Sequence, residues 1–149
     1  MKNNNNAEKL ANLTFNLLAK CQAKEAWIAE KHGLFPSEFK CLRLLGHNGE
    51  LNNKDIAKLM NLSASRLTRI VDGLVKKGYL MREINSEDRR NMRLNLLKRG
   101  KQLTEKLDES YVDIHREILQ EIEPDKHLGL VTAMENLLFA IEKWLQKPE

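Results

Sequence analysis

Residues 51–97, LNNKDIAKLMNLSASRLTRIVDGLVKKGYLMREINSEDRRNMRLNLL, decide the fold of this chain. Asn52 and Ser63 stand where helix N-caps belong, because each precedes a short run whose apolar residues repeat at helical spacing. Gly78 follows the second run as a residue that is free to take positive φ at a helix end. The stretch therefore predicts two short helices in tandem, joined by a turn at Asn61 and Leu62.

One side of each predicted helix is expected to be buried. The expected inward residues are Ile56, Leu59 and Met60 in the first helix, and Leu67, Ile70, Val71, Leu74 and Val75 in the second. The remaining positions of the second helix carry short polar side chains and arginines. Such side chains can reach base edges and phosphates in DNA. We therefore expect the outward side of the second helix to be a contact surface.

A β-hairpin is predicted behind the helix pair. Residues 80–84 and 92–96 partly alternate apolar and polar side chains, and they flank the polar tip SEDRRN, residues 86–91. A helix pair followed by an arginine-bearing hairpin can place one helix in a DNA major groove and an arginine in the neighbouring minor groove. The pattern therefore favours DNA binding.

The charge distribution agrees with this interpretation. The whole chain has a net charge of +4, whereas residues 34–100 contain fourteen Lys and Arg against seven Asp and Glu, a net +7. The rest of the chain is therefore net negative, at −3. A basic centre is the expected footprint of phosphate binding, although a solvated charged surface has a similar pattern.

The composition is that of an ordinary folded domain. The chain has 149 residues, of which 42% are hydrophobic and 31% charged, so it can bury a core and is too apolar to be disordered. No apolar run approaches the length of a membrane span, and residues 1–6 lack the hydrophobic core of a signal peptide. We expect a cytoplasmic protein with no membrane partner.

Little in the sequence points to metal, cofactor or catalytic chemistry. Cys21 and Cys41 match no Cys-x-x-Cys spacing, and the four histidines are scattered, with no two lying three or four residues apart. The sequence contains no nucleophile with a plausible base, no carboxylate pair at a defined spacing and no glycine-rich phosphate loop. We expect no metal, no cofactor and no enzymatic activity.

Long apolar helices are predicted at both ends of the chain. Residues 7–31 contain no Pro or Gly, and the segments before and after Pro124 repeat apolar residues three and four apart. Their apolar faces are wider than one small domain can cover, so we expect a second copy of the chain to cover them. The chain is divided accordingly into a disordered tail (1–6), a winged helix region (34–100) and one compact helical dimerisation region (7–33 with 101–149).

Three segments, in this order and spacing, resemble the MarR/SlyA family of transcriptional regulators. They are residues 56–60 (IAKLM), the stretch from Ser63 to Leu80, and Asp88-Arg89-Arg90. The resemblance implies a mainly α (α+β) fold, with a winged helix-turn-helix core and long N- and C-terminal dimerisation helices. It also implies a homodimer that binds a pseudo-palindromic operator in double-stranded DNA, most often as a repressor. Phe35 departs from the family pattern, which often has Thr or Ser there as a helix cap.

The residues expected to contact DNA lie on the helix pair and the hairpin tip. They are Asn53, Lys54, Ser63, Ser65, Arg66, Thr68, Arg69, Arg89, Arg90 and Asn91. Arginines on the second helix can hydrogen-bond a guanine, while Asn53 and Lys54 can hold a phosphate at a helix N-terminus. Arg89 or Arg90 is expected to enter the minor groove, with Asp88 positioning an arginine by ion pairing. Lys76 and Lys77 are expected to face phosphate or solvent.

The resemblance further implies a small-molecule effector site between the terminal helices and the winged region, commonly for aromatic or lipophilic anions. Residues that could line it are Phe15, Ala19, Trp27, Phe35, Phe39 and Tyr111, although each is also explained as a core residue. Two other functions stay open. One is a helical dimerisation or protein-interaction adaptor without DNA readout, and the other is a redox-sensing regulator that uses Cys21 or Cys41.

Overall fold

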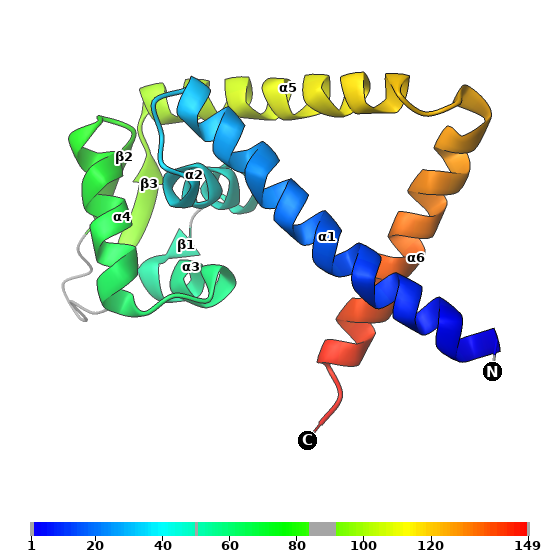
Figure 1. The fold of residues 1–149 in the computed structure, drawn as a ribbon. Helices are drawn as coiled ribbons and strands as arrows, with labels where there is room; N and C mark the ends of the chain where they lie inside the picture. Colours follow the sequence, from blue (N-terminus) through cyan, green and yellow to red (C-terminus); the bar gives the residue numbers. More distant parts are fainter. Residues whose placement is uncertain (1, 50, 84–91, 149) are drawn as a thin grey trace. The chain divides into compact units, whose positions relative to one another are not determined.

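A computed structural model describes residues 2–49, 51–83 and 92–148 (Figure 1). The helices are α1 (Lys2–Lys31), α2 (Pro36–Asn48), α3 (Asn53–Met60), α4 (Ala64–Lys76), α5 (Lys98–Gln120), the short 3-10 helix η1 (Pro124–Lys126) and α6 (His127–Leu145). The strands are β1 (Leu51–Asn52), β2 (Leu80–Glu83) and β3 (Arg93–Leu96). The chain is thus mainly helical with one small sheet, as the sequence predicts.

Side-chain caps start both short helices where the sequence predicts them. The Asn52 side chain accepts a hydrogen bond from the backbone N–H of Asp55 at 2.7 Å, and the Ser63 hydroxyl accepts one from Arg66 at 3.3 Å. Asn61 turns the chain between the helices with a left-handed backbone, φ 54°. Asparagine tolerates this conformation better than most residues, which explains its place here. Gly78 ends the second helical segment with φ 80°, as predicted.

The sheet has one strand more than the predicted hairpin. Its order is β1-β3-β2, with both pairs antiparallel; Leu51 lies opposite Leu94, and Leu80 opposite Leu96. Two residues are too few to show an alternating pattern, so β1 leaves no signal in the sequence. It joins the start of α3 to the first residues of β3.

The core lies among α2, α3, α4, the sheet, the C-terminal end of α1 and the N-terminal end of α5. Its buried apolar residues are Ile28, Ala29, Leu34, Phe39, Cys41, Leu42, Leu45, Ile56, Met60, Leu67, Val71, Leu74, Leu80, Leu94, Leu103 and Leu107. The prediction that Leu59 is buried is wrong, because its side chain is 53% exposed. Leu59 and Met60 differ by about 100° around the helix, and α3 turns Ile56 and Met60 to the core while Leu59 stays at the edge of the buried face. Ile70 and Val75 are half-buried.

The chain divides into two compact units, residues 1–109 and residues 110–149. This differs from the predicted division, which places both terminal helices in one unit. Helix α1 joins the first unit because it packs on α2, with Ile28 and Ala29 fully buried. The boundary falls inside α5, whose buried residues all lie between Gly100 and Leu107.

The N-terminus also differs from the prediction. Helix α1 begins at Lys2, so it includes Asn3 to Asn6, which the sequence predicts as part of a disordered tail. Asparagine is a weak helix former but does not break a helix, and no Pro or Gly interrupts this stretch. No helix within the described ranges is both long and apolar enough to cross a membrane.

Candidate nucleic-acid interface

Helix α4 separates its residues into a buried side and a polar outward side. Leu67, Val71 and Leu74 are buried on the inward side. Every predicted contact residue of α4 is exposed: Ser65, Arg66, Thr68 and Arg69. The outward side therefore presents two arginines and two hydroxyl side chains, as the sequence predicts. These groups suit hydrogen bonding to base edges and phosphates.

Local hydrogen bonds organise the first turn of α4. Ser63 caps the helix and its hydroxyl lies 3.3 Å from that of Ser65. The Thr68 hydroxyl donates to the carbonyl of Ala64 at 2.9 Å, which leaves its lone pairs as acceptors. Ser63 thus serves mainly as a cap, while Ser65 and Thr68 stand beside it on the exposed surface.

An ion pair that the sequence reasoning missed joins α4 to the sheet. The guanidinium of Arg82 on β2 donates to the carboxylate of Asp72 and also approaches the Thr68 carbonyl at 3.4 Å. Asp72 lies on the outward side of α4, and Arg82 reaches it from the half of β2 nearer the tip. The pair therefore holds the hairpin against the exposed face of α4.

At the start of α3 the two predicted phosphate contacts lie in different surroundings. Lys54 is exposed, and the helix N-terminus beside it favours anions. Asn53 is half-buried, its backbone N–H donates to the Met92 carbonyl at 2.9 Å, and its amide oxygen is buried with no partner among the described residues. Of the two, Lys54 is the better placed for a phosphate.

The predicted contacts of the hairpin tip, Arg89, Arg90 and Asn91, and the positioning residue Asp88 lie outside the described residues. The strands that lead to the tip are described. Their ends nearest the tip carry Arg82 and Arg93, of which Arg93 is exposed. The basic character predicted for this region therefore continues into the described part of the sheet.

Lys77 does not lie as the sequence predicts. Its ammonium group contacts the carboxylate of Glu38 at 2.6 Å and the Gly33 carbonyl at 3.1 Å, so it points to the start of α2, and 34% of its side chain is exposed. Lys76, its neighbour, is exposed. Glu38 is 3% exposed and was not among the predicted functional residues. Its position three residues after the helix cap, where a glutamate often bonds back to the cap, is the signal that could have found it.

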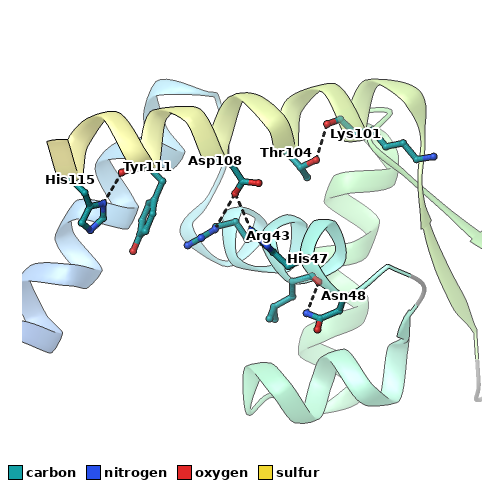
Figure 2. A network of polar contacts seen from close by, with 9 residues as sticks. Arg43, His47, Asn48, Lys101, Thr104, Asp108, Tyr111 and His115 are labelled. Atoms are coloured by element: carbon teal, nitrogen blue, oxygen red, sulfur yellow. Dashed lines mark hydrogen bonds and ion pairs between the residues drawn. The ribbon is translucent and has the colours of Figure 1, made fainter. Parts of the chain in front are cut away.

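A second polar cluster joins α2 to α5 in the first unit (Figure 2). Asp108 points from α5 toward α2, where it lies 3.1 Å from the imidazole of His47 and 3.5 Å from the guanidinium of Arg43. All three side chains are partly exposed, so each ion pair adds little stability by itself. Their effect is to align α5 with α2.

The six predicted effector residues do not line one described cavity. Phe39 is buried in the core, whereas Phe15, Ala19, Trp27 and Phe35 are exposed and Tyr111 belongs to the second unit. A hollow of about 390 Å³ at the α1–α2 corner includes Phe35. Another of about 580 Å³ is lined by residues of α1, α2 and α3 with their turns, among them Cys21. Either is large enough for a small aromatic molecule.

The two cysteines differ in their surroundings. Cys41 is fully buried, and burial together with the charge of Glu38 raises the pKa of its thiol to about 12. A thiol in that state is unreactive at neutral pH. Cys21 is half-buried, with the Lys24 ammonium 3.8 Å from its sulfur. Within the described residues, no three His, Cys, Asp or Glu side chains group as a metal site.

Comparison with known sequences gives a consistent result. The sequence profile of the MarR family matches residues 34–92, which include α3, α4 and β2. The uncharacterized HTH-type transcriptional regulator YcgE of Bacillus subtilis (strain 168) is 35% identical over 97 residues, 62% of this chain and 63% of that protein. The HTH-type transcriptional repressor MdtR of the same organism is 32% identical over 84 residues, 56% of this chain and 54% of that protein. The match thus spans less than two thirds of either relative.

A solved structure shares the fold over a longer range. The apo form of wild-type MarR from E. coli superimposes with a TM-score of 0.74, covering 89% of this chain and 95% of that one, at 22% sequence identity. Both named relatives are described as HTH-type transcriptional regulators or repressors.

Proposed function

We propose that the chain is a transcriptional regulator of the MarR family that binds double-stranded DNA as a homodimer, a proposal supported by the family match and by the resemblance to YcgE. One observation carries the proposal. The face of α4 that turns away from the core presents Ser65, Arg66, Thr68 and Arg69, and all four are exposed. A short helix that presents arginines and hydroxyls beside a basic hairpin suits insertion into a major groove.

The contacts divide by chemistry. Arg66 and Arg69 are proposed to read bases or phosphates from the major groove, with Ser65 and Thr68 beside them. Lys54 is proposed to hold a phosphate at the start of α3, and Asn53 can add only a donor because its amide oxygen is buried. Arg89, Arg90, Asn91 and Asp88 keep their proposed roles at the minor groove.

The dimer is supported by the apolar surface of the second unit. No residue of α6 is buried, and nine of its large apolar side chains are exposed: Leu128, Leu130, Val131, Met134, Leu138, Phe139, Ile141, Trp144 and Leu145. Such a surface needs a cover. A second copy provides a self-complementary cover and places two α4 helices on successive major grooves, about 34 Å apart.

Repression and effector control belong to the same proposal. The name of MdtR, a transcriptional repressor, supports repression as the default outcome. The hollow of about 580 Å³ among α1, α2, α3 and their turns supports an effector site, since a ligand there contacts the elements that orient α4. We keep the cytoplasm as the proposed location, because a bacterial-type regulator acts where the DNA lies.

The test is a selection of bound fragments from random duplex DNA, followed by binding titrations on the selected site at several salt concentrations. We expect a pseudo-palindromic site and one dimer per site. If about six phosphates are neutralised, affinity falls about a thousandfold between 50 and 200 mM salt. The Arg69→Ala variant is expected to lose about 1–3 kcal/mol on the selected site if Arg69 reads a base.

Two outcomes would contradict this proposal or part of it. A dimer that enriches no fragment and ignores DNA at low salt would favour the alternative of a protein-interaction adaptor. An equal loss for Arg69→Ala on selected and random DNA would reassign that residue to phosphate.

A further inference from the structure

We propose that the ion pair between the buried Glu38 and the partly exposed Lys77 sets the tilt of α4, so that both are positioning residues for DNA recognition and neither touches DNA. The inference rests on the proposed function and deepens it. It gives two residues outside the DNA-contact surface a role in orienting that surface.

Glu38 is a buried charge with few ways to be satisfied. It is 3% exposed, and one carboxylate oxygen accepts hydrogen bonds from the Phe35 backbone N–H at 2.9 Å and from the Lys77 ammonium at 2.6 Å. A buried carboxylate is costly unless it is paired and hydrogen-bonded. Lys77 therefore cannot leave without leaving the Glu38 charge uncompensated.

The other carboxylate oxygen bears directly on the backbone of α4. A Cβ atom added at Gly73 would lie 2.7 Å from Glu38 Oε2, closer than such atoms normally approach. Gly73 thus lets the helix rest against the carboxylate. The single side chain of Glu38 meets α4 at two places, at Gly73 and, through the ion pair, at Lys77 just beyond the end of the helix.

The Lys77 ammonium is engaged by partners within the first unit. It donates to the Glu38 carboxylate and to the Gly33 carbonyl at 3.1 Å, and its nitrogen lies 5.1 Å from the centroid of the Phe35 ring. Phe35 and Gly33 form the corner between α1 and α2. The contacts of Lys77 therefore tie the end of α4 to that corner.

A change in the tilt of α4 would shift the residues proposed to contact DNA. At 1.5 Å per residue, the contact residues Ser65 to Arg69 lie about 12–18 Å along the axis from Lys77. A tilt of a few degrees about the held end would move them by about 1 Å, which is enough to spoil hydrogen bonds to bases. Contacts with flexible phosphate-facing side chains tolerate such a shift better, so discrimination should suffer before total affinity does.

Three variants and one control test the proposal: Lys77→Met, Glu38→Gln, the double variant, and Lys76→Met as the matched exposed lysine. Each is titrated by fluorescence anisotropy with the selected site and with a random duplex, over a range of salt. Circular dichroism and size-exclusion chromatography establish that every sample compared is folded and dimeric.

We expect Lys77→Met to reduce the ratio of specific to random affinity about tenfold with an unchanged salt slope. Adding Glu38→Gln should restore most of that ratio, because the neutral amide needs no cation and still accepts from the Phe35 N–H. Lys76→Met should change both affinities by one common factor. If Lys77→Met fails to fold, Glu38→Gln alone still decides, with an expected loss of discrimination of a few fold although no basic group is removed.

Two results would overturn the inference. The first is equal loss on both DNAs for Lys77→Met with a salt slope lower by about one, which would make Lys77 a phosphate contact. The second is an unchanged ratio in every variant that folds. The proposed function is judged separately, because it fails only when the unmodified protein itself shows no preference among DNA sequences.

Discussion

The unit of residues 1–109 and the unit of residues 110–149 solve the burial of apolar surface in opposite ways. In the first, α2, α4 and the sheet enclose Phe39, Leu42, Leu74 and Leu80 almost completely. In the second, α6 buries none of its residues although it is rich in Leu, Phe and Trp. The first unit encloses a hydrophobic core, whereas the apolar side chains of α6 in the second unit stay exposed.

The contrast shows what each apolar pattern is for. Leucines of the winged region fix where α4 sits, because they fill a core that the chain itself closes. Leucines of α6 can be satisfied only by another apolar surface, since each is already folded into a helix with nothing covering it. The winged region therefore specifies a shape, whereas α6, like the exposed apolar residues of α1, specifies a partner.

Gly100→Ala should have the largest effect on stability, because it places an extra atom within the closely packed first unit. A Cβ atom at residue 100 would lie 2.2 Å from the backbone oxygen of Tyr79, which cannot move without moving the start of the sheet. We expect a loss of about 4 kcal/mol or more in the free energy of unfolding by urea denaturation. Gly129→Ala on α6 is the control, since nothing lies within 4 Å of its added Cβ and helix propensity should favour it by up to about 1 kcal/mol. Equal effects of the two variants would contradict the comparison.

Leu138→Glu tests the uncovered unit. Its side chain is 59% exposed in the single chain, so the variant should leave the fold intact while placing a charge in the proposed dimer interface. We expect the dimer dissociation constant to rise about thirtyfold or more, measured by analytical ultracentrifugation. Leu59→Glu on α3 is matched in exposure at 53% and should leave the dimer unchanged. The idea fails if both leucines behave alike.

The smallest expected effect concerns Cys41, whose rate of labelling reports how well the core excludes solvent. Its thiol has a pKa raised from 9.0 to about 12, so the folded state favours the neutral thiol. This preference adds stability below pH 9 and is lost as the pH rises toward 12. At pH 8 iodoacetamide should therefore label the half-buried Cys21 well before Cys41, as read by peptide mass spectrometry. Rapid labelling of Cys41 in the native protein would show that the core opens easily. It would then favour the alternative in which Cys41 is a redox sensor.

Much of the fold could be predicted because its signals are local. The caps at Asn52 and Ser63 and the glycine at residue 78 each act on neighbours within a few residues, so the sequence displays them directly. The exposed positions of α4 follow from the inward stripe of Leu67, Val71 and Leu74. Leu59 shows the limit, since periodicity alone does not say which edge of an apolar stripe the core will cover.

The parts that could not be predicted depend on residues far apart in the chain. The pairing of Glu38 with Lys77 and of Asp72 with Arg82 joins elements whose approach is fixed by packing, and no spacing rule links such residues. The strand β1 exists only because β3 passes beside it. Aromatic character likewise does not determine which surface a residue faces: Phe39 is buried, whereas Phe15, Trp27 and Phe35 are exposed.

The sequence by itself determined that this chain forms two capped helices and a hairpin with a polar, arginine-bearing face, because helix and turn formation depend on near neighbours. Only the tertiary structure decided which charged residues pair next to that face and which apolar surface is left uncovered. The physical reason is that burial and ion pairing act through space, and the distances they need are set when the core closes.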